Sequence, residues 1–102
     1  MKIENMVSAN GNAVSNQFIV TEHGCGALGN FTERKTFQSY STTIAIKTTW
    51  PCGRVDIVLD RDSWDCSVTT GKYRNQFLGE TKKDTERKIK SGEYKLIPLN
   101  RR

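Results

Sequence analysis

The segment TTIAIKTTWPCGRVDIVLDRDSW, residues 42–64, decides the fold class. In its first half, two isoleucines alternate with Thr, Ala and Lys, and after a Pro-Cys-Gly turn every second residue from Val55 to Leu59 is aliphatic. A period of two is the pattern of a half-buried strand, and two such runs around a short turn predict a β-hairpin. We therefore expect paired strands over residues 42–48 and 54–59.

A second hairpin is predicted upstream of this one. Residues 16–21 (NQFIVT) and 35–40 (KTFQSY) are both rich in β-branched and aromatic residues, which favours an antiparallel pair. A glycine-rich loop, residues 23–30, joins the two predicted strands. Residues 7–15 are small and polar and contain an Asn-Gly turn signal, so we expect a loop or an irregular N-terminal arm over residues 1–15.

Downstream of the hairpins, the hydrophobic period changes from that of a strand to that of a helix. Thr69 or Thr70 can cap a short helix that ends at Leu78 before Gly79, with Tyr73 and Phe77 on one face.

A second, charged helix follows the first. It opens with the capping box Thr81-Lys82-Lys83-Asp84 and ends at Ser91-Gly92, and Ile89 is its only large apolar residue. Residues 94–99 alternate and contain Pro98, which favours an edge strand. The predicted fold is α+β: a twisted antiparallel sheet of about four to five strands, with one face covered by two short helices.

Length and composition indicate one globular domain, residues 1–102, with 26% charged and 9% aromatic residues. The N-terminus lacks an apolar signal segment and no apolar run approaches membrane-spanning length, so we expect a cytoplasmic protein that contacts no membrane. Three cysteines are an odd number, which favours reduced thiols. The edge strand over residues 94–99 would also permit a homodimer, and the sequence leaves monomer and homodimer open.

Positive charge is concentrated in the last third of the chain. Residues 71–102 carry ten Lys and Arg against four Asp and Glu, whereas residues 1–70 carry six against seven. Such a segment is attracted to nucleic-acid phosphates or to an acidic protein surface. Lys83, Arg87 and Lys90 would form one stripe at i, i+4 and i+7. The pairs Asp84–Lys88 and Glu86–Lys90 would neutralise a neighbouring helix face. The candidate binding residues are Lys72, Arg74, Lys82, Lys83, Arg87 and Lys90.

The glycine-rich loop matches Gly-x-Gly-x-x-Gly at residues 24–29, but it leads into a predicted strand instead of a helix. A dinucleotide fingerprint needs a strand–turn–helix unit, so we favour a contact loop. Its candidate contact residues are His23, Leu28, Asn30, Phe31 and Arg34.

Two sets of residues raise the question of a metal, and we expect neither a metal site nor another cofactor. Zinc could be held by His23, Cys25, Cys52 and Cys66, but these lack the usual close pairs, and buried or half-buried thiols explain the cysteines as well. Mg²⁺ could be held by acidic residues after the second hairpin, although such residues also make ordinary turns and caps. The acidic set comprises Asp60, Asp62 and Asp65, with Asp56 nearby.

The block WDCSVTTGKYRNQFLGE, residues 64–80, together with KIKSGEY at residues 88–94, resembles a family of small uncharacterised proteins carried by tailed bacteriophages. The stretches GNAVSNQF, residues 11–18, and FQSY, residues 37–40, are similar to the same family. The resemblance carries no catalytic residues. In this chain the connection over residues 22–34 is longer than in such relatives.

The resemblance implies a protein of an infected bacterium that acts by binding host machinery. We expect a non-enzymatic binder of a host protein or nucleoprotein complex, for example an anti-CRISPR protein. The alternatives are an accessory protein that binds DNA or RNA through the basic helix, and a metal-dependent nuclease that uses the acidic set above.

Overall fold

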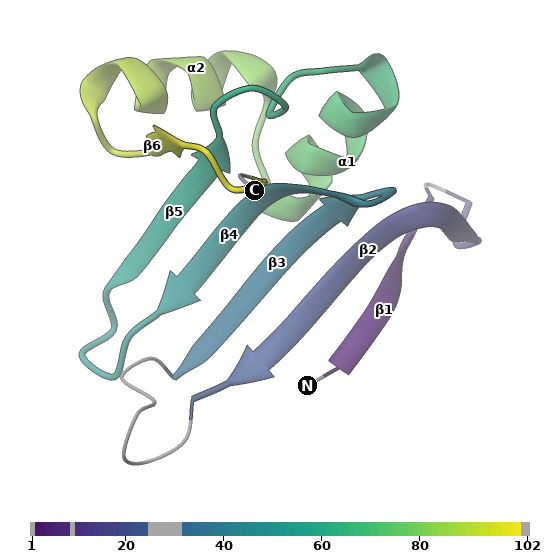
Figure 1. The fold of residues 1–102 in the computed structure, drawn as a ribbon, viewed down its shortest axis with the longest axis horizontal. Helices are drawn as coiled ribbons and strands as arrows, with labels where there is room; N and C mark the ends of the chain where they lie inside the picture. Colours follow the sequence, from purple (N-terminus) through teal and green to yellow (C-terminus); the bar gives the residue numbers. More distant parts are fainter. Residues whose placement is uncertain (1, 9, 25–31, 101–102) are drawn as a thin grey trace.

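One sheet of six strands and two helices make up the described part of the computed structural model, which comprises residues 2–8, 10–24 and 32–100 (Figure 1). The sheet has more strands than the sequence predicts, and its strands lie side by side in chain order. In chain order the elements are β1 (Lys2–Val7), β2 (Ala13–His23), β3 (Glu33–Ser39), β4 (Thr42–Thr49), β5 (Val55–Asp60), α1 (Val68–Leu78), α2 (Lys82–Ser91) and β6 (Lys95–Ile97).

Both predicted hairpins are present, since β2 pairs with β3 and β4 with β5, each antiparallel. The expectation of a purely antiparallel sheet is wrong at one edge, because β6 pairs parallel to β5. The chain leaves β5, passes through both helices and returns, and such a crossover brings the next strand back in the same direction. The predicted edge position of the last strand is confirmed.

The N-terminal segment forms a strand instead of the irregular arm expected over residues 1–15. Ile3 lies opposite Val20 in an antiparallel pair, and a bulge between Asn5 and Val7 lets Met6 enter the core, where it is 3% exposed. A six-residue run with three polar side chains has little strand signal of its own, so pairing with β2 decides its structure.

The core lies between one face of the sheet and the helices. Phe37 on β3 stacks on Phe77 on α1 with ring centroids 5.8 Å apart. On the same face, Ser39 is 3.1 Å from Thr70 of α1 and accepts a hydrogen bond from Gln17. The predicted aromatic face of α1 is thereby confirmed. The buried apolar residues are Met6, Phe37, Ile44, Ala45, Leu59, Tyr73 and Tyr94.

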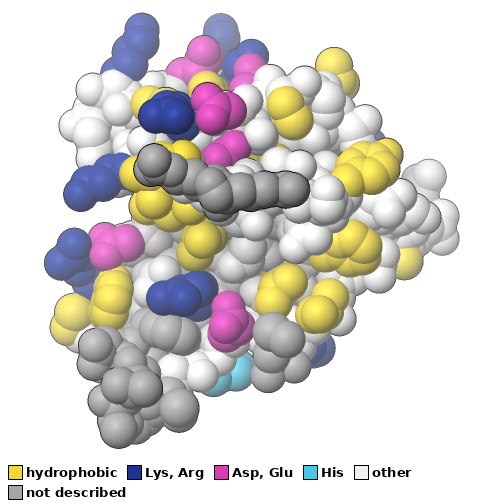
Figure 2. All heavy atoms as spheres, in the orientation of Figure 1, with side chains coloured by type: hydrophobic (Ala, Val, Ile, Leu, Met, Phe, Trp, Pro, Cys, Tyr) yellow, Lys and Arg dark blue, Asp and Glu magenta, His cyan; other side chains and the backbone are white. Residues whose placement is uncertain are grey.

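The opposite face of the sheet carries a row of residues that alternate with this core. Thr36 lies opposite Val20 on one side and Ile46 on the other, and Ile46 lies opposite Val58. All four side chains are half-buried. Figure 2 shows hydrophobic side chains interspersed with charged ones over the visible side of the molecule.

Local signals set the helix ends. Ser67 caps α1 by accepting from the Thr70 amide, two to three residues earlier than the predicted Thr69 or Thr70 cap, and Gly79 ends the helix at φ 71°. The capping box of Thr81 and Asp84 opens α2 as predicted, and Gly92 ends it at φ 85°. Left-handed backbone is open to glycine because it has no Cβ. Neither helix has the length or composition to span a membrane within the described residues.

Candidate functional site

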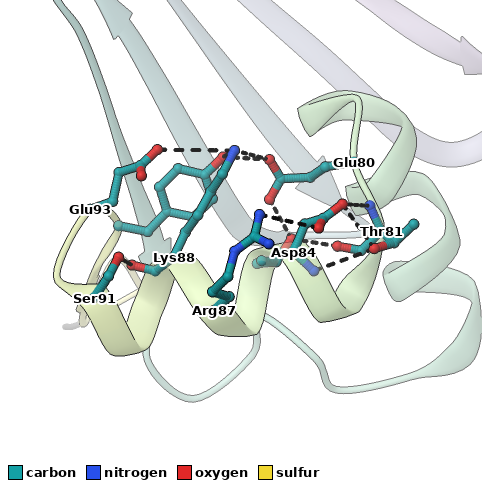
Figure 3. Close-up of polar contacts among 9 residues, drawn as sticks. Glu80, Thr81, Asp84, Arg87, Lys88, Ser91 and Glu93 are labelled. Carbon is teal, nitrogen blue, oxygen red and sulfur yellow. Dashed lines mark hydrogen bonds and ion pairs between the residues drawn. The ribbon is translucent and has the colours of Figure 1, made fainter.

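The inner face of α2 is anchored by Glu80, the residue just before its cap (Figure 3). Its carboxylate accepts hydrogen bonds from the Thr85 hydroxyl at 2.6 Å, the Tyr94 hydroxyl at 2.7 Å and the Lys88 ammonium at 2.9 Å. Glu93 adds a second, longer ion pair to Lys88 at 4.0 Å. Lys88 therefore stabilises the fold and is not free to bind a partner. Its predicted pairing with Asp84 is wrong.

The three groups of this cluster shift one another's pKa values. Burial raises the pKa of Glu80, but the hydrogen bonds from Thr85, Lys88 and Tyr94 outweigh it and hold the pKa below its ordinary value. The hydrogen bond to Glu80 raises the pKa of Lys88. Burial, together with donation to Glu80, raises the pKa of Tyr94 to about 12. The cluster keeps a charged pair and a neutral phenol at neutral pH.

Arg74 does not lie on the surface, contrary to its place among the candidate binding residues. It is 1% exposed, and its guanidinium donates to the Trp64 carbonyl at 2.7 Å, to Asp65 at 3.2 Å and to Asn75 at 2.9 Å. It also lies 5.1 Å from the Trp64 ring. A guanidinium that is buried in this way ties α1 to the preceding turn and leaves no surface for a partner.

Asp65 also forms an ion pair with Lys82, so the Lys82 ammonium is not a free charge. The Lys82 ammonium lies 2.7 Å from its second carboxylate oxygen, and this hydrogen bond raises the pKa of Lys82. The hydrogen bond from Lys82, aided by Arg74, lowers the pKa of Asp65 in turn. Lys72 on α1 stays exposed, with its ammonium 5.5 Å from the Tyr73 ring.

The outer face of α2 carries what we call the cationic stripe: Lys83, Arg87 and Lys90. These residues share one helix face at i, i+4 and i+7 and, with Glu86, line a shallow depression. Arg87 is held 3.3 Å from Asp84. Lys83 and Lys90 form no ion pair with any residue in the described ranges, so the predicted Glu86–Lys90 pair is not formed. The stripe, together with the exposed Lys72 on α1, is the part of the predicted basic surface that remains available to a partner.

The described residues that flank the predicted contact loop lie at the other end of the sheet. His23 ends β2 and Arg34 lies near the start of β3, and both positions are distant from the helices (Figure 1). His23 is exposed and lies opposite Glu33 in the sheet. Leu28, Asn30 and Phe31 fall outside the described residues. His23 and Arg34 therefore do not share a surface with the cationic stripe.

The proposed zinc ligands are not brought together where they can be placed. Cys52 lies in the turn between β4 and β5, whereas Cys66 precedes α1 at the opposite end of the sheet (Figure 1). Both are free thiols and both are exposed, not buried or half-buried as expected. Cys25 falls outside the described residues.

The acidic set is also divided among separate contacts. Asp60 is 2% exposed and accepts from the Leu99 amide at 2.8 Å, while Asp62 pairs with Arg61 at 3.5 Å. Asp65 holds the two cations described above. Across residues 2–8, 10–24 and 32–100, no three His, Cys, Asp or Glu side chains gather as a metal site would require. The sequence favoured turn and cap roles for the acidic set, and Asp60 has such a role.

The comparison with known families covers nearly the whole chain. The model of DUF8033, a family of unknown function, matches residues 1–93. The chain belongs to this family. No curated protein and no solved structure matches the chain. The DUF8033 match ends just before Tyr94, although the Tyr94 hydroxyl completes the Glu80 cluster.

Little in the sequence indicates the carboxylates that pair with Arg74, Lys82 and Lys88. Asp65 and Glu80 are nine and eight residues away from Arg74 and Lys88, which is outside the i, i+3 and i, i+4 spacings of a helix. The one available signal was Trp64-Asp65 just ahead of a helix, since an aromatic ring and a carboxylate together can hold a guanidinium.

Proposed function

We propose that this protein is a small non-enzymatic binding protein that blocks a host nucleoprotein complex through the cationic stripe of α2. The observation that carries the proposal is the outward position of Lys83, Arg87 and Lys90, of which Lys83 and Lys90 have no carboxylate partner among the described residues. The nature of the target rests on the resemblance to phage proteins, and a CRISPR effector is an example of such a complex.

The pairing of three nearby cations with carboxylates explains why the stripe would dominate recognition. Arg74, Lys82 and Lys88 are each satisfied by Asp65 or Glu80, so their charge is largely cancelled at short range. Coulomb attraction between exposed charges is screened over about 10 Å at 0.1 M salt. A partner is therefore attracted mainly by the unpaired charges close to its own surface. The partner surface is therefore expected to be acidic or lined by phosphate.

The test is affinity purification from nuclease-treated lysate of the bacterial host. We expect the wild-type protein to recover a stoichiometric complex, and the double variant Lys83→Glu/Lys90→Glu to lose it. The matched control is Arg54→Glu/Arg61→Glu, which makes the same charge change at two exposed residues outside α2. Loss of the partner from both variants would point to net charge alone, and recovery of no partner by the wild type would contradict the proposal.

Direct binding of nucleic acid is the second candidate, favoured by the spacing of the two unpaired ammonium groups. Seven residues of α-helix separate Lys83 from Lys90, which is about 10 Å along the axis, and long lysine side chains at that separation can reach two phosphates of one strand. With two to three phosphate contacts, log affinity for duplex DNA should fall with log salt at a slope of roughly −2 to −3. Binding that is insensitive to salt, or a partner that survives nuclease treatment, would remove this candidate.

A further inference from the structure

The outer edge of β1 is the longer of the two edges of the sheet. It spans six residues, whereas β6 at the other edge spans three and is followed by Pro98. At its far end the Val7 carbonyl accepts a hydrogen bond from Gln76 of α1 at 2.9 Å. Residues 2–4 lie at the end of the sheet away from the helices (Figure 1). An unpaired edge offers a row of backbone donors and acceptors to another strand.

The side chains along this open part combine an exposed aliphatic residue with two charges of opposite sign. Ile3 is 62% exposed and lies opposite Val20, so it extends the apolar row of the sheet face to its very margin. Lys2 and Glu4 point to the other face, with their charged groups 3.6 Å apart. Natural edges are commonly protected by charge, proline or a bulge. Here the bulge lies only at Asn5–Val7, and the two charges on the open part have opposite signs.

We propose that this edge binds β1 of a second copy of the same chain, antiparallel about a twofold axis that passes through Ile3. In this register Ile3 lies opposite Ile3 of the second copy. Lys2 of each copy then lies opposite Glu4 of the other. Two cross-strand ion pairs on one face and an aliphatic pair on the other would form at once.

Charge selects this register over its neighbours. Side chains alternate between the faces of a strand, so two identical antiparallel strands can slip only by two residues at a time without placing mismatched faces together. A slip in one direction places Lys2 opposite Lys2, and a slip in the other places Glu4 opposite Glu4. Like charges in directly opposite positions are destabilising. A further slip toward Val7 meets the bulge and the carbonyl that Gln76 already occupies.

The arrangement leaves room for the rest of both molecules. The helices lie beyond the Val7 end of β1, and in an antiparallel pair the Val7 ends of the two copies point in opposite directions (Figure 1). The helices of the two copies would then lie at opposite ends of one continuous sheet. The edge over residues 94–99, where the sequence had suggested a homodimer, is a poorer candidate because only Lys95–Ile97 is strand.

The test is sedimentation equilibrium of the wild type and two single variants, Lys2→Glu and Glu4→Lys. A short edge interface belongs to the weak class, so we expect a wild-type dimer with a Kd of roughly 10⁻⁵ to 10⁻⁴ M. Each variant alone places like charges opposite each other twice, and its Kd should rise by about tenfold or more. An equimolar mixture of the two variants should restore the dimer, because positions 2 and 4 then carry carboxylates in one chain and ammonium groups in the other.

The mixture is decisive because neither variant retains the Lys2–Glu4 ion pair within its own strand. A wild type that stays monomeric at about 1 mM, or a dimer that neither charge reversal weakens, would overturn the proposal.

A disulfide test reports the register directly in a chain that carries Cys25→Ser, Cys52→Ser and Cys66→Ser. Ile3→Cys should cross-link two copies on mild oxidation.

The matched control for the cross-link is Asn5→Cys. In the proposed register the two copies of this position are offset by four residues, about 13 Å along the strands, which is beyond the Cα separation that a disulfide tolerates. Equal cross-linking at both positions, or cross-linking only at Asn5→Cys, would show that the register is wrong.

Discussion

Arg74 is the largest of the side chains that are almost fully buried in the described part of the chain. Burying a guanidinium costs free energy unless its donors are paired, and here Nη1 and Nη2 donate to three acceptors while the Trp64 ring lies alongside. The buried Nε has no hydrogen-bond partner in the described part of the chain. Asp65 supplies the opposite charge. Gly71, one turn earlier, lies beside both groups, since a Cβ at this position would contact the Arg74 and Asp65 side chains at 3.7 Å.

This arrangement predicts that Arg74→Ala lowers the free energy of unfolding by about 2–4 kcal/mol, because the Trp64 carbonyl and Asn75 lose their donor in a buried site. Arg74→Lys should give an intermediate loss, since an ammonium cannot reach all three acceptors. The measurement is urea unfolding followed by circular dichroism. Lys72→Ala on the same helix is the control and should change stability by less than about 0.5 kcal/mol. Equal, small effects at both positions would contradict the role given to Arg74.

At the scale of elements, α2 is joined to its neighbours by charge more than by apolar area. Ile89 is its large apolar contact with the core, as the sequence predicted, whereas Glu80 and Tyr94 hold the helix from its two ends. Thr85 is fully buried and donates to Glu80 from the middle of the helix. Removing the carboxylate charge should therefore weaken the contacts that Glu80 makes with Thr85, Lys88 and Tyr94.

The Glu80 cluster predicts a pH dependence of stability. The folded protein holds the pKa of Glu80 below its ordinary value of 4.5, so the carboxylate contributes stability above about pH 4.5 that is lost as the pH falls through the folded pKa. Glu80→Gln should lower the free energy of unfolding by roughly 1–3 kcal/mol at pH 7. Its difference from the wild type should then shrink as the pH falls from about 6 to about 3.

Denaturant unfolding at several pH values measures this difference. Glu86→Gln is the matched control, because Glu86 lies on the outer face of α2, is exposed and has no ion pair among the described residues. Its difference from the wild type should stay small at every pH. At high pH the raised pKa of Tyr94 limits stability at the alkaline end, since stability present below about pH 10 is lost as the pH rises toward 12. A constant difference between Glu80→Gln and the wild type would contradict this account.

At the scale of the whole molecule, the last described residues close the fold. Leu96 of β6 lies opposite Leu59 of β5, and the Leu99 amide donates to the buried Asp60. The Asn100 side chain makes two hydrogen bonds to the backbone of Thr43, at 2.7 and 2.8 Å. These contacts hold the C-terminal segment against the hairpin of β4 and β5.

Truncation separates these contributions. A chain that ends at Ile97 loses the Leu99 and Asn100 hydrogen bonds and should unfold with about 1–3 kcal/mol less free energy than the full chain. A chain that ends at Glu93 also loses Tyr94, which is 5% exposed, and should lose roughly a further 3–5 kcal/mol. Thermal and urea unfolding measure both. Full stability of the chain that ends at Glu93 would show that residues 94–100 are dispensable.

The sequence by itself determined the elements whose signals are local. The period of two over residues 42–59, the capping box at Thr81 and the glycines at 79 and 92 act within a few residues, so the hairpins and helices could be predicted from them. Tertiary structure alone decided that β1 is a strand, that β6 runs parallel and that Arg74 is buried. Each of these depends on groups distant in sequence, since strand pairing and the pairing of a buried charge are set by what the folded chain brings alongside. The same reason reduced the predicted basic surface to the cationic stripe and Lys72, because the carboxylates of Asp65 and Glu80 neutralise Arg74, Lys82 and Lys88.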